Sequence, residues 1–272
     1  MELIDTHCHL TYEPLADDIE AVVARSLAAG VTGWVTVGTG AEHNRKAVAL
    51  AERFENMYAA IGIHPHHAKD ITGAMLAELK DLARNDKVVA LGETGLDFHY
   101  ELSPRHDQRR AFTAQLEIAR ELNLPVVIHS REAFDETMDI LEQFVLLHGR
   151  LRGVVFHCFS GSAEEARIVL DHGFYVSFTG VVTFKNAENT RAAAAIVPLE
   201  RLMLETDCPY LSPEPMRKQK TNEPALMIHT ARFLAELKQI PLPEFAQAVT
   251  ATSKAFFNLP APRMAGLPCP RP

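Results

Sequence analysis

The chain has 272 residues, of which 47% are hydrophobic, and its formal net charge at pH 7 is −8. This charge disfavours broad coating of nucleic acid, although a basic patch or bound metal ions could reverse the sign within one cleft. No stretch reaches the roughly 18 apolar residues of a membrane span, no signal peptide precedes the first segment, and four cysteines do not suggest a disulfide framework. We therefore expect a cytoplasmic protein with reduced thiols, no membrane contact and no obligate protein partner.

Short β-type segments alternate with longer helical patterns along the chain. Several of the short segments are rich in valine and isoleucine, as in parallel strands that are buried on both faces. The predicted strands are Leu3–Asp5, Gly33–Val37, Tyr58–Ile63, Val88–Gly92, Pro125–Ile128, Gly153–Phe156, Phe174–Phe178 and Arg201–Leu204. Apolar residues with helical spacing lie between them: Ile19, Val22, Val23 and Leu27; Phe112, Leu116, Ala119 and Leu122; Phe134, Met138, Leu141 and Val145. Ser103 and Pro104 are typical of an N-cap and a first-turn proline.

Eight strands separated by helices predict an α/β fold with a single domain, a TIM-type (β/α)8 barrel. A doubly wound open sheet is the main alternative, but no glycine fingerprint follows the first strand. We expect the barrel to span residues 1–259. Residues 260–272 contain five prolines and are expected to form an irregular or disordered tail.

Metal-binding side chains follow several of the predicted strands. They are His7, His9, Glu93, His129, His157 and Asp207. The carboxyl ends of barrel strands meet at one face, so these six side chains are expected to converge there. Alternation along a strand places His7 and His9 on the same side, and directs Cys8, Cys158 and Cys208 away from the metals. A single histidine at a strand end is more often structural, but the whole set predicts a metal site.

Four histidines and two carboxylates suit zinc, manganese, iron or nickel, with magnesium also possible. The set is too large for one tetrahedral zinc ion, so we expect two divalent ions bridged by Glu93. Such a pair lowers the pKa of a bound water, and Asp207 is the candidate to orient or deprotonate that water.

The ordered motifs resemble the TatD family of metal-dependent deoxyribonucleases, within the amidohydrolase superfamily. The resemblance extends from about Leu3 to Leu259 and rests on Ile4–His9, Gly62–His66, Gly92–Asp97, His129–Arg131, His157–Gly161, Glu205–Leu211 and Asn222–Pro224. It implies one ion on His7, His9, Glu93 and Asp207, and another on Glu93, His129 and His157. It also implies hydrolysis of phosphodiester bonds in DNA, of the 3′-5′ exonuclease type. The chain departs from the family in Arg217–Thr221, where relatives often have Arg-Gly, and at Ser253, where many have Asn.

Several other residues are candidates for catalysis or substrate binding, and each could instead have a purely structural role. His64 completes the expected catalytic set with Glu93 and Asp207, and His66 is a candidate substrate contact, although both could simply bond to the backbone. Arg131 could bind a phosphate or pair with Glu132 or Asp135.

The remaining candidate contacts lie at and after the last strand. Glu205 could hydrogen-bond a ligand histidine and is counted, with Arg217 and Asn222, among the candidate substrate contacts. Arg217, Lys218 and Lys220 form either a solvated loop or a rim that follows phosphates.

Asp97 is expected to cap a loop, and Trp34 to lie in the core. The sequence offers no aromatic platform for stacking bases.

DNA is therefore the expected substrate. The alternative is an amidohydrolase-type enzyme that cleaves an amide, ester or lactone with the same water. A non-catalytic metal-binding protein is a weaker third hypothesis, because Asp207 completes the catalytic set.

Overall fold

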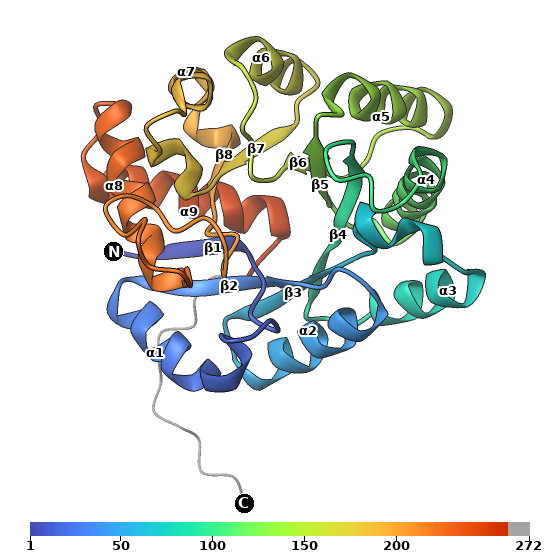
Figure 1. Ribbon diagram of the computed structural model, residues 1–272, viewed down its shortest axis with the longest axis horizontal. Coiled ribbons are helices and arrows are strands. Elements are labelled where there is room, and N and C mark those ends of the chain that lie inside the picture. Colours follow the sequence, from blue (N-terminus) through green and yellow to red (C-terminus); the bar gives the residue numbers. More distant parts are fainter. Residues whose placement is uncertain (261–272) are drawn as a thin grey trace, which may run out of the picture.

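A computed structural model describes residues 1–260 of the chain. Parallel strands form one eight-stranded sheet in the order β1 to β8, and the helices surround it (Figure 1). The strands are β1 Leu3–Cys8, β2 Val31–Val37, β3 Met57–Ile61, β4 Val88–Asp97, β5 Val126–Arg131, β6 Val154–Phe156, β7 Tyr175–Phe178 and β8 Leu202–Leu204. The predicted α/β barrel is confirmed. The predicted tail, apart from Pro260, lies outside the described residues.

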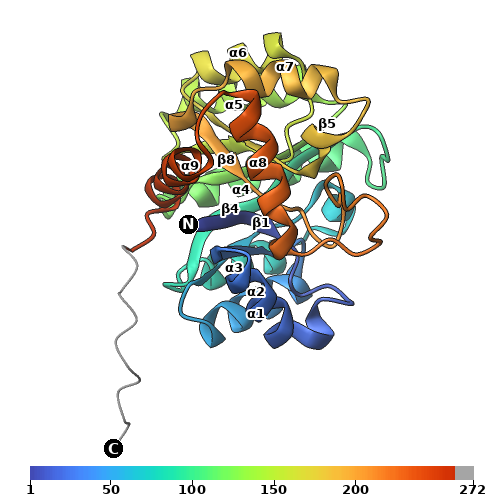
Figure 2. The same cartoon turned by 90° about the vertical axis from the view of Figure 1, so that its left-hand side faces the viewer.

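Helices alternate with the strands, and two helices follow the last strand. They are α1 Ile19–Ala28, α2 Ala41–Arg53, α3 Gly73–Leu82, α4 Arg105–Glu121, α5 Phe134–His148, α6 Ala163–Asp171, α7 Glu188–Ile196, α8 Met227–Leu237 and α9 Leu242–Phe257. The N-terminus and α9 lie at one end of the barrel, and the segment between β8 and α8, drawn in orange, projects from the other (Figure 2). None of the described helices combines the length and apolar character needed to cross a membrane.

The strands separate two apolar layers. Ile128, Phe156 and Leu204 pack in the large cluster that also contains the helix residues. The residues just before them, Val127, Val155 and Met203, belong to a second cluster inside the barrel, closed by the end of α9. This alternation follows from the two-residue period of a strand, and it decides which later residues face the barrel axis.

The first and last strands meet beyond the end of β8. The backbone N–H of Asp207 donates to the carbonyl of His7 at 2.9 Å, and that of His9 donates to Cys208 at 2.8 Å. The Thr6 hydroxyl donates to the carbonyl of Leu204. These bonds join the two sheet edges where metal-binding residues had been predicted.

Some local predictions were wrong. β4 continues through Glu93 to Asp97, with a shift in its pairing to β5 between Leu91 and Thr94. α4 begins at Arg105 after Pro104, without a side-chain cap. Ser103 does not cap it, because its hydroxyl donates to the carbonyl of His66 and accepts the N–H of Lys69.

The predicted apolar face of α1 also needs correction. Leu27 is 49% exposed, and the buried position beside it is taken by Ser26. The Ser26 hydroxyl accepts the indole N–H of Trp34 at 2.8 Å, which satisfies the polar edge of that ring. Trp34 is buried in the core, as predicted.

Candidate metal centre

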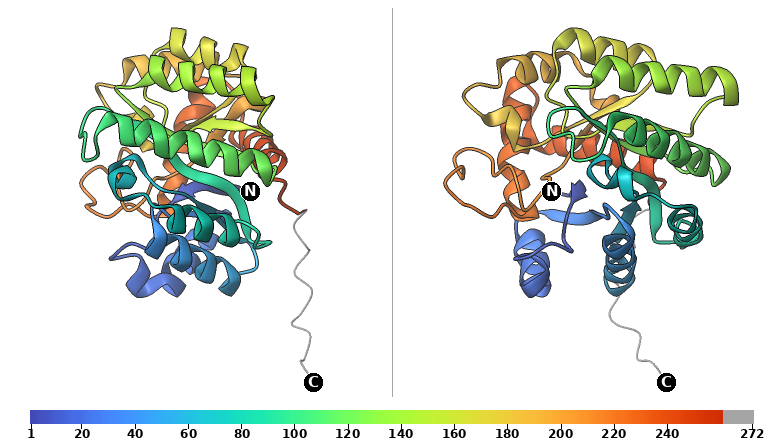
Figure 3. Two further views of the ribbon diagram at one scale, coloured as in Figure 1. Left: turned by 90° about the vertical axis from the view of Figure 1, so that its right-hand side faces the viewer. Right: turned by 45° about the vertical axis from the view of Figure 1, so that its right-hand side comes forward.

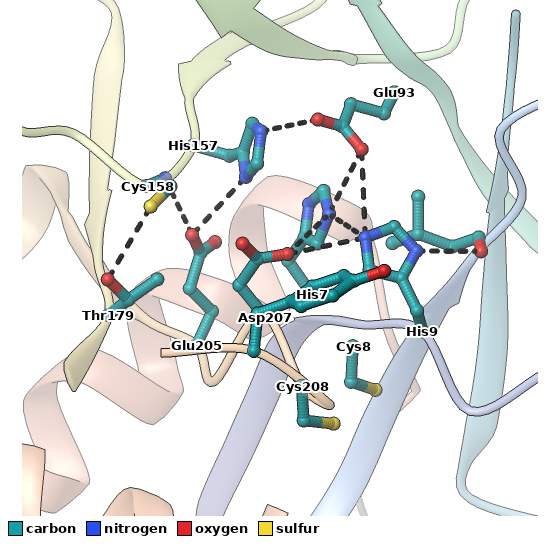
Figure 4. A network of polar contacts seen from close by, with 12 residues as sticks. His7, Cys8, His9, Glu93, His157, Cys158, Thr179, Glu205, Asp207 and Cys208 are labelled. Atoms are coloured by element: carbon teal, nitrogen blue, oxygen red, sulfur yellow. Dashed lines mark hydrogen bonds and ion pairs between the residues drawn. The ribbon is translucent and has the colours of Figure 1, made fainter. Parts of the chain in front are cut away.

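The two-residue alternation of the strands continues from the apolar core of the barrel into a polar site above it. His129, His157 and Glu205 each lie two residues after the inner residues Val127, Val155 and Met203. They therefore face the barrel axis just above the apolar layer, at the carboxyl ends of the strands. Asp207 lies beyond β8 and meets His7 of β1 and His9, which directly follows β1 (Figure 4).

The first histidine cluster has the spacing of atoms that share one ion. The Nε2 atoms of His7 and His9 are 3.3 Å apart, and Asp207 Oδ1 lies 3.7 Å and 3.2 Å from them. Glu93 Oε2 lies 3.5 Å and 3.8 Å from the same two nitrogens. A tetrahedron with bonds of about 2.1 Å has edges of about 3.4 Å. The five distances, from 3.2 to 3.8 Å, are close to the edges of such a polyhedron.

The second oxygen of Glu93 serves a different cluster. Glu93 Oε1 lies 2.8 Å from His129 Nδ1, 2.8 Å from His157 Nε2 and 3.4 Å from His64 Nε2. One buried carboxylate therefore faces both groups of histidines, one oxygen to each. These buried clusters of histidine and carboxylate suggest a binuclear metal site.

Hydrogen bonds on the far side of the rings orient two of the histidines. His129 Nε2 lies 3.0 Å from Asp97 Oδ2, and His9 Nδ1 lies 3.3 Å from the carbonyl of Val37. A proton on each of these nitrogens leaves the lone pair of the other nitrogen directed into the centre. This is the usual support of a metal-binding histidine. The other two, His7 and His157, each have a buried Nδ1 without a hydrogen-bond partner among the described residues, although Glu205 Oε1 lies 3.4 Å from that of His157.

His64 has a different tautomer. Its Nδ1 accepts the backbone N–H of His66 at 3.1 Å, so the neutral ring carries its proton on Nε2, which faces Glu93. Burial is the main cause that lowers the pKa of His64, to about 4. At neutral pH the ring is therefore uncharged and can donate a hydrogen bond from Nε2.

Neighbouring carboxylates and histidines in the centre shift one another's pKa values. Burial alone would raise the pKa of Glu93, but His157, His64 and the hydrogen bond from His129 hold it well below its usual range. Burial alone would lower the pKa of His157, yet Glu93 and Glu205 raise it well above its usual value. In the absence of metal, Glu93 is thus an anion that favours protonated histidine around it.

Two carboxylates, Asp5, which was not predicted, and Asp97, which was expected only as a cap, hold the ligands in position. Asp5 Oδ1 accepts the N–H groups of His7 and Thr206, and Oδ2 accepts the Thr206 hydroxyl at 2.6 Å. Asp97 was expected in a loop, but it ends β4, accepts His129, and also accepts the N–H groups of His99 and Tyr100. The available signal was spacing, because Asp5 lies two residues before His7 and Asp97 four after Glu93.

The predicted substrate contacts separate into two groups. Asn222 is a correction: it is fully buried, its amide donates to the carbonyls of Thr206 and Tyr210, and its oxygen accepts the N–H of Glu223. It secures the loop after β8 and has no polar atom left for a substrate. Glu205 is also buried and bonded within the protein, through Cys158 N–H and the Ser177 hydroxyl.

The other candidate contacts lie nearer the surface. His66 shares Asp97 with His129, at 3.0 Å. Arg131 is exposed and lies 4.6 Å above the ring of Tyr100, and among residues 1–260 it forms no ion pair. Arg217 is exposed and lies 3.8 Å above the ring of Phe184.

The three cysteines next to the ligands differ in their surroundings. Cys8 and Cys208 are buried and lie below His7 and Asp207, away from the converging donors (Figure 4). The Cys8 thiol donates to the carbonyl of Val35, and burial raises its pKa well above the usual value. Cys158 is partly exposed and follows β6 with a positive φ of 47°, so simple strand alternation does not describe it. Its thiol lies 3.5 Å from the Thr179 hydroxyl.

A nearly closed parallel barrel with histidine and carboxylate donors at its carboxyl ends defines a metal-dependent hydrolase with an amidohydrolase-like fold. Residues 4–258 match the family described as TatD related DNase, and the chain belongs to this family. It is 41% identical to the uncharacterized metal-dependent hydrolase YabD of Bacillus subtilis, over 94% of this chain and 99% of that protein. It is 37% identical to the 3′-5′ ssDNA/RNA exonuclease TatD of Pantoea ananatis, over 94% and 100% respectively. The crystal structure of YJJV, a TatD homologue from Escherichia coli, superposes with a TM-score of 0.88 at 34% identity, covering 95% of this chain and 98% of that one.

Proposed function

We propose that this protein is a two-metal phosphodiesterase that removes nucleotides from the 3′ end of single-stranded DNA. The observation that carries the proposal is the division of Glu93 between two histidine clusters, since two-metal sites are the usual means of cleaving phosphodiesters. The family description names a DNase, and relatives such as that of Pantoea ananatis are named as 3′-5′ exonucleases.

The donor set specifies how the ions would be held. His7, His9, Glu93 and Asp207 would bind one ion, and Glu93, His129 and His157 the other. The nitrogen-rich donors favour zinc, manganese, iron or nickel over magnesium. His64 is excluded from the ligands in its neutral form, because the proton on Nε2 occupies the lone pair that would face the metal.

The ions, when bound, would supply an activated water and neutralise charge on the phosphoryl oxygens. Asp207 uses Oδ1 toward His9, so its other oxygen can accept the proton of the attacking water. Burial raises the pKa of Asp207, but the hydrogen bond from His9 and the charges of His7 and His9 outweigh this and lower it, so the group is ionised and ready to act as a base. His64 can donate its Nε2 proton in a hydrogen bond to a phosphate oxygen.

The test is a cleavage assay on 5′-labelled single-stranded DNA with each candidate metal, beside RNA and a small carboxylic ester. We expect a ladder of products shortened one nucleotide at a time from the 3′ end. The Asp207→Asn variant should lose at least about 100-fold in rate, because an amide cannot take the proton. Hydrolysis of the ester without cleavage of nucleic acid would replace this proposal with the amidohydrolase alternative.

A further inference from the structure

Two neighbouring hollows lie at the carboxyl ends of the strands, and Ser160 lines both. The proximal hollow has a volume of about 580 Å³, and its lining includes His157, Arg131, Phe159 and Ser160. The distal hollow has a volume of about 490 Å³, and its lining includes Ser160, Phe184, Lys185 and Arg217. His157 lines the proximal hollow, which places that hollow beside the candidate metal ligands. Each volume lies in the range of small-molecule sites.

The distal hollow is basic in an acidic protein. Lys185 and Arg217 are exposed, and within residues 1–260 neither forms an ion pair. Glu214 is the one carboxylate in its lining, so the formal charge there is +1 (two positive groups and one negative), against −8 for the chain. The Arg217 guanidinium stacks on Phe184, which fixes the plane of the cation and leaves its outer face and N–H groups available.

The walls of the distal hollow are held rigidly. The Arg191 guanidinium donates to the carbonyls of Val182, Phe184 and Lys185, with distances of 3.4, 2.6 and 3.2 Å. The Thr183 hydroxyl accepts the backbone N–H of Glu214 at 2.8 Å, which ties the segment after β7 to the projecting loop after β8 (Figure 3). Two loops that are distant in sequence are thus fixed against each other before any ligand arrives.

Among the described residues, the lining of the proximal hollow includes one cation, Arg131, and four carboxylates. Of the carboxylates in its lining, Glu132 pairs with His99 and Glu136 with Arg109, while Asp135 is exposed. Glu165 also lines the hollow, but it is bonded to the backbone N–H of Ser162. Arg131 lies over Tyr100 and has no carboxylate partner among the described residues.

We propose that the two hollows form one groove that binds the part of the strand which continues away from the scissile bond. This inference rests on the proposed function. The proximal hollow takes the nucleotide next to the metals, with Arg131 at its phosphate, and Lys185 and Arg217 bind the following phosphate. A groove that opens to solvent suits the continuing strand, because a terminal nucleotide needs only one closed pocket. The enzyme is therefore specific for oligonucleotides, and its kcat/KM increases with each of the first few nucleotides.

Length dependence tests the groove. For the wild type we expect kcat/KM on 5′-labelled DNA to rise from the dinucleotide to the tetranucleotide and then level off. The double variant Lys185→Ala/Arg217→Ala should lose about 10-fold or more on the tetranucleotide, with no change on bis(p-nitrophenyl) phosphate. The slope of its salt dependence of binding should fall by about 0.7, because the two residues neutralise one phosphate of a single strand.

The matched control removes two positive charges at the other end of the barrel. Arg150 and Arg152 are exposed and precede β6, so they lie at the amino ends of the strands. Arg150→Ala/Arg152→Ala should keep the wild-type length dependence and salt slope, and Lys185→Arg/Arg217→Lys should restore both. The groove would be overturned if Lys185→Ala/Arg217→Ala had the same length dependence and the same salt slope as the wild type. The proposed function would still stand in that case, because the wild type would still cleave DNA. Absence of any cleavage of nucleic acid by the wild type would overturn both.

Discussion

At the scale of single residues, Glu93 is the side chain on which both clusters depend. Glu93→Gln replaces one oxygen by an amide nitrogen that has no lone pair for a metal. We expect bound metal to fall from two ions per chain to one or none, with hydrolysis reduced at least about 100-fold. Elemental analysis after metal saturation measures this, with the exposed Glu132→Gln as control. If Glu93→Gln retained two ions per chain, Glu93 would not bridge the two metal ions.

Asp97 acts on the metal through His129. It accepts the proton of Nε2 and thereby directs Nδ1 toward Glu93. Loss of such a partner typically weakens metal binding by about 10-fold to 100-fold. Asp97→Asn should therefore weaken the ion on His129 and His157 by that factor and leave the other ion unchanged. Stepwise metal titration resolves the two; an equal effect on both ions, or none, contradicts the assignment. The exposed Asp139→Asn variant is the control.

At the scale of elements, the contact between β4 and β5 places two ligands side by side. Gly95 pairs with His129, has a φ of +135°, and a Cβ there would come within 2.1 Å of the His129 carbonyl oxygen. Gly95→Ala must push the strands apart, so we expect a loss of about 2–4 kcal/mol in the free energy of unfolding. Urea denaturation measures it. Gly73→Ala is the control, because it has open space at the start of α3 and should be neutral or slightly stabilising.

The strand pattern predicted most of the fold because parallel strands buried on both faces leave recognisable apolar segments. The same signal failed at β4, where Gly92–Asp97 has no apolar run although it belongs to the strand. The two-residue spacing within a strand predicted that His7 and His9 lie on the same side. The same spacing, applied two residues earlier, would have predicted that Asp5 lies there as well. The roles of Asn222 and Ser103 were out of reach, because both are set by backbone groups on other loops that only the fold brings near.

At the scale of the whole molecule, metal binding at the centre is expected to depend on pH and to stabilise the folded chain. Glu93 and Glu205 raise the pKa of His157, whereas a metal requires the neutral ring. Protons therefore compete with metal: affinity is greatest above the raised pKa and falls as the pH drops through it. Titration calorimetry in buffers of different ionisation enthalpy should detect protons released on binding. Equal heats in all buffers would contradict the linkage.

Metal should also raise the melting temperature. An ion that binds only the folded chain adds about 2.7 kcal/mol at a free concentration of 100 times its Kd. A chelator should remove this gain, and the same scan on Glu93→Gln should show a smaller shift.

The joint between β1 and the segment after β8 has a consequence for the order of events during synthesis. Asp5 and Thr206, whose bonds fix this joint, are 201 residues apart in the chain. His7 and His9 leave the ribosome early, but the carboxylate that completes their donor set follows only after three quarters of the chain. A nascent chain thus carries half of the proposed donor set and lacks the proposed base until its two distant segments have met.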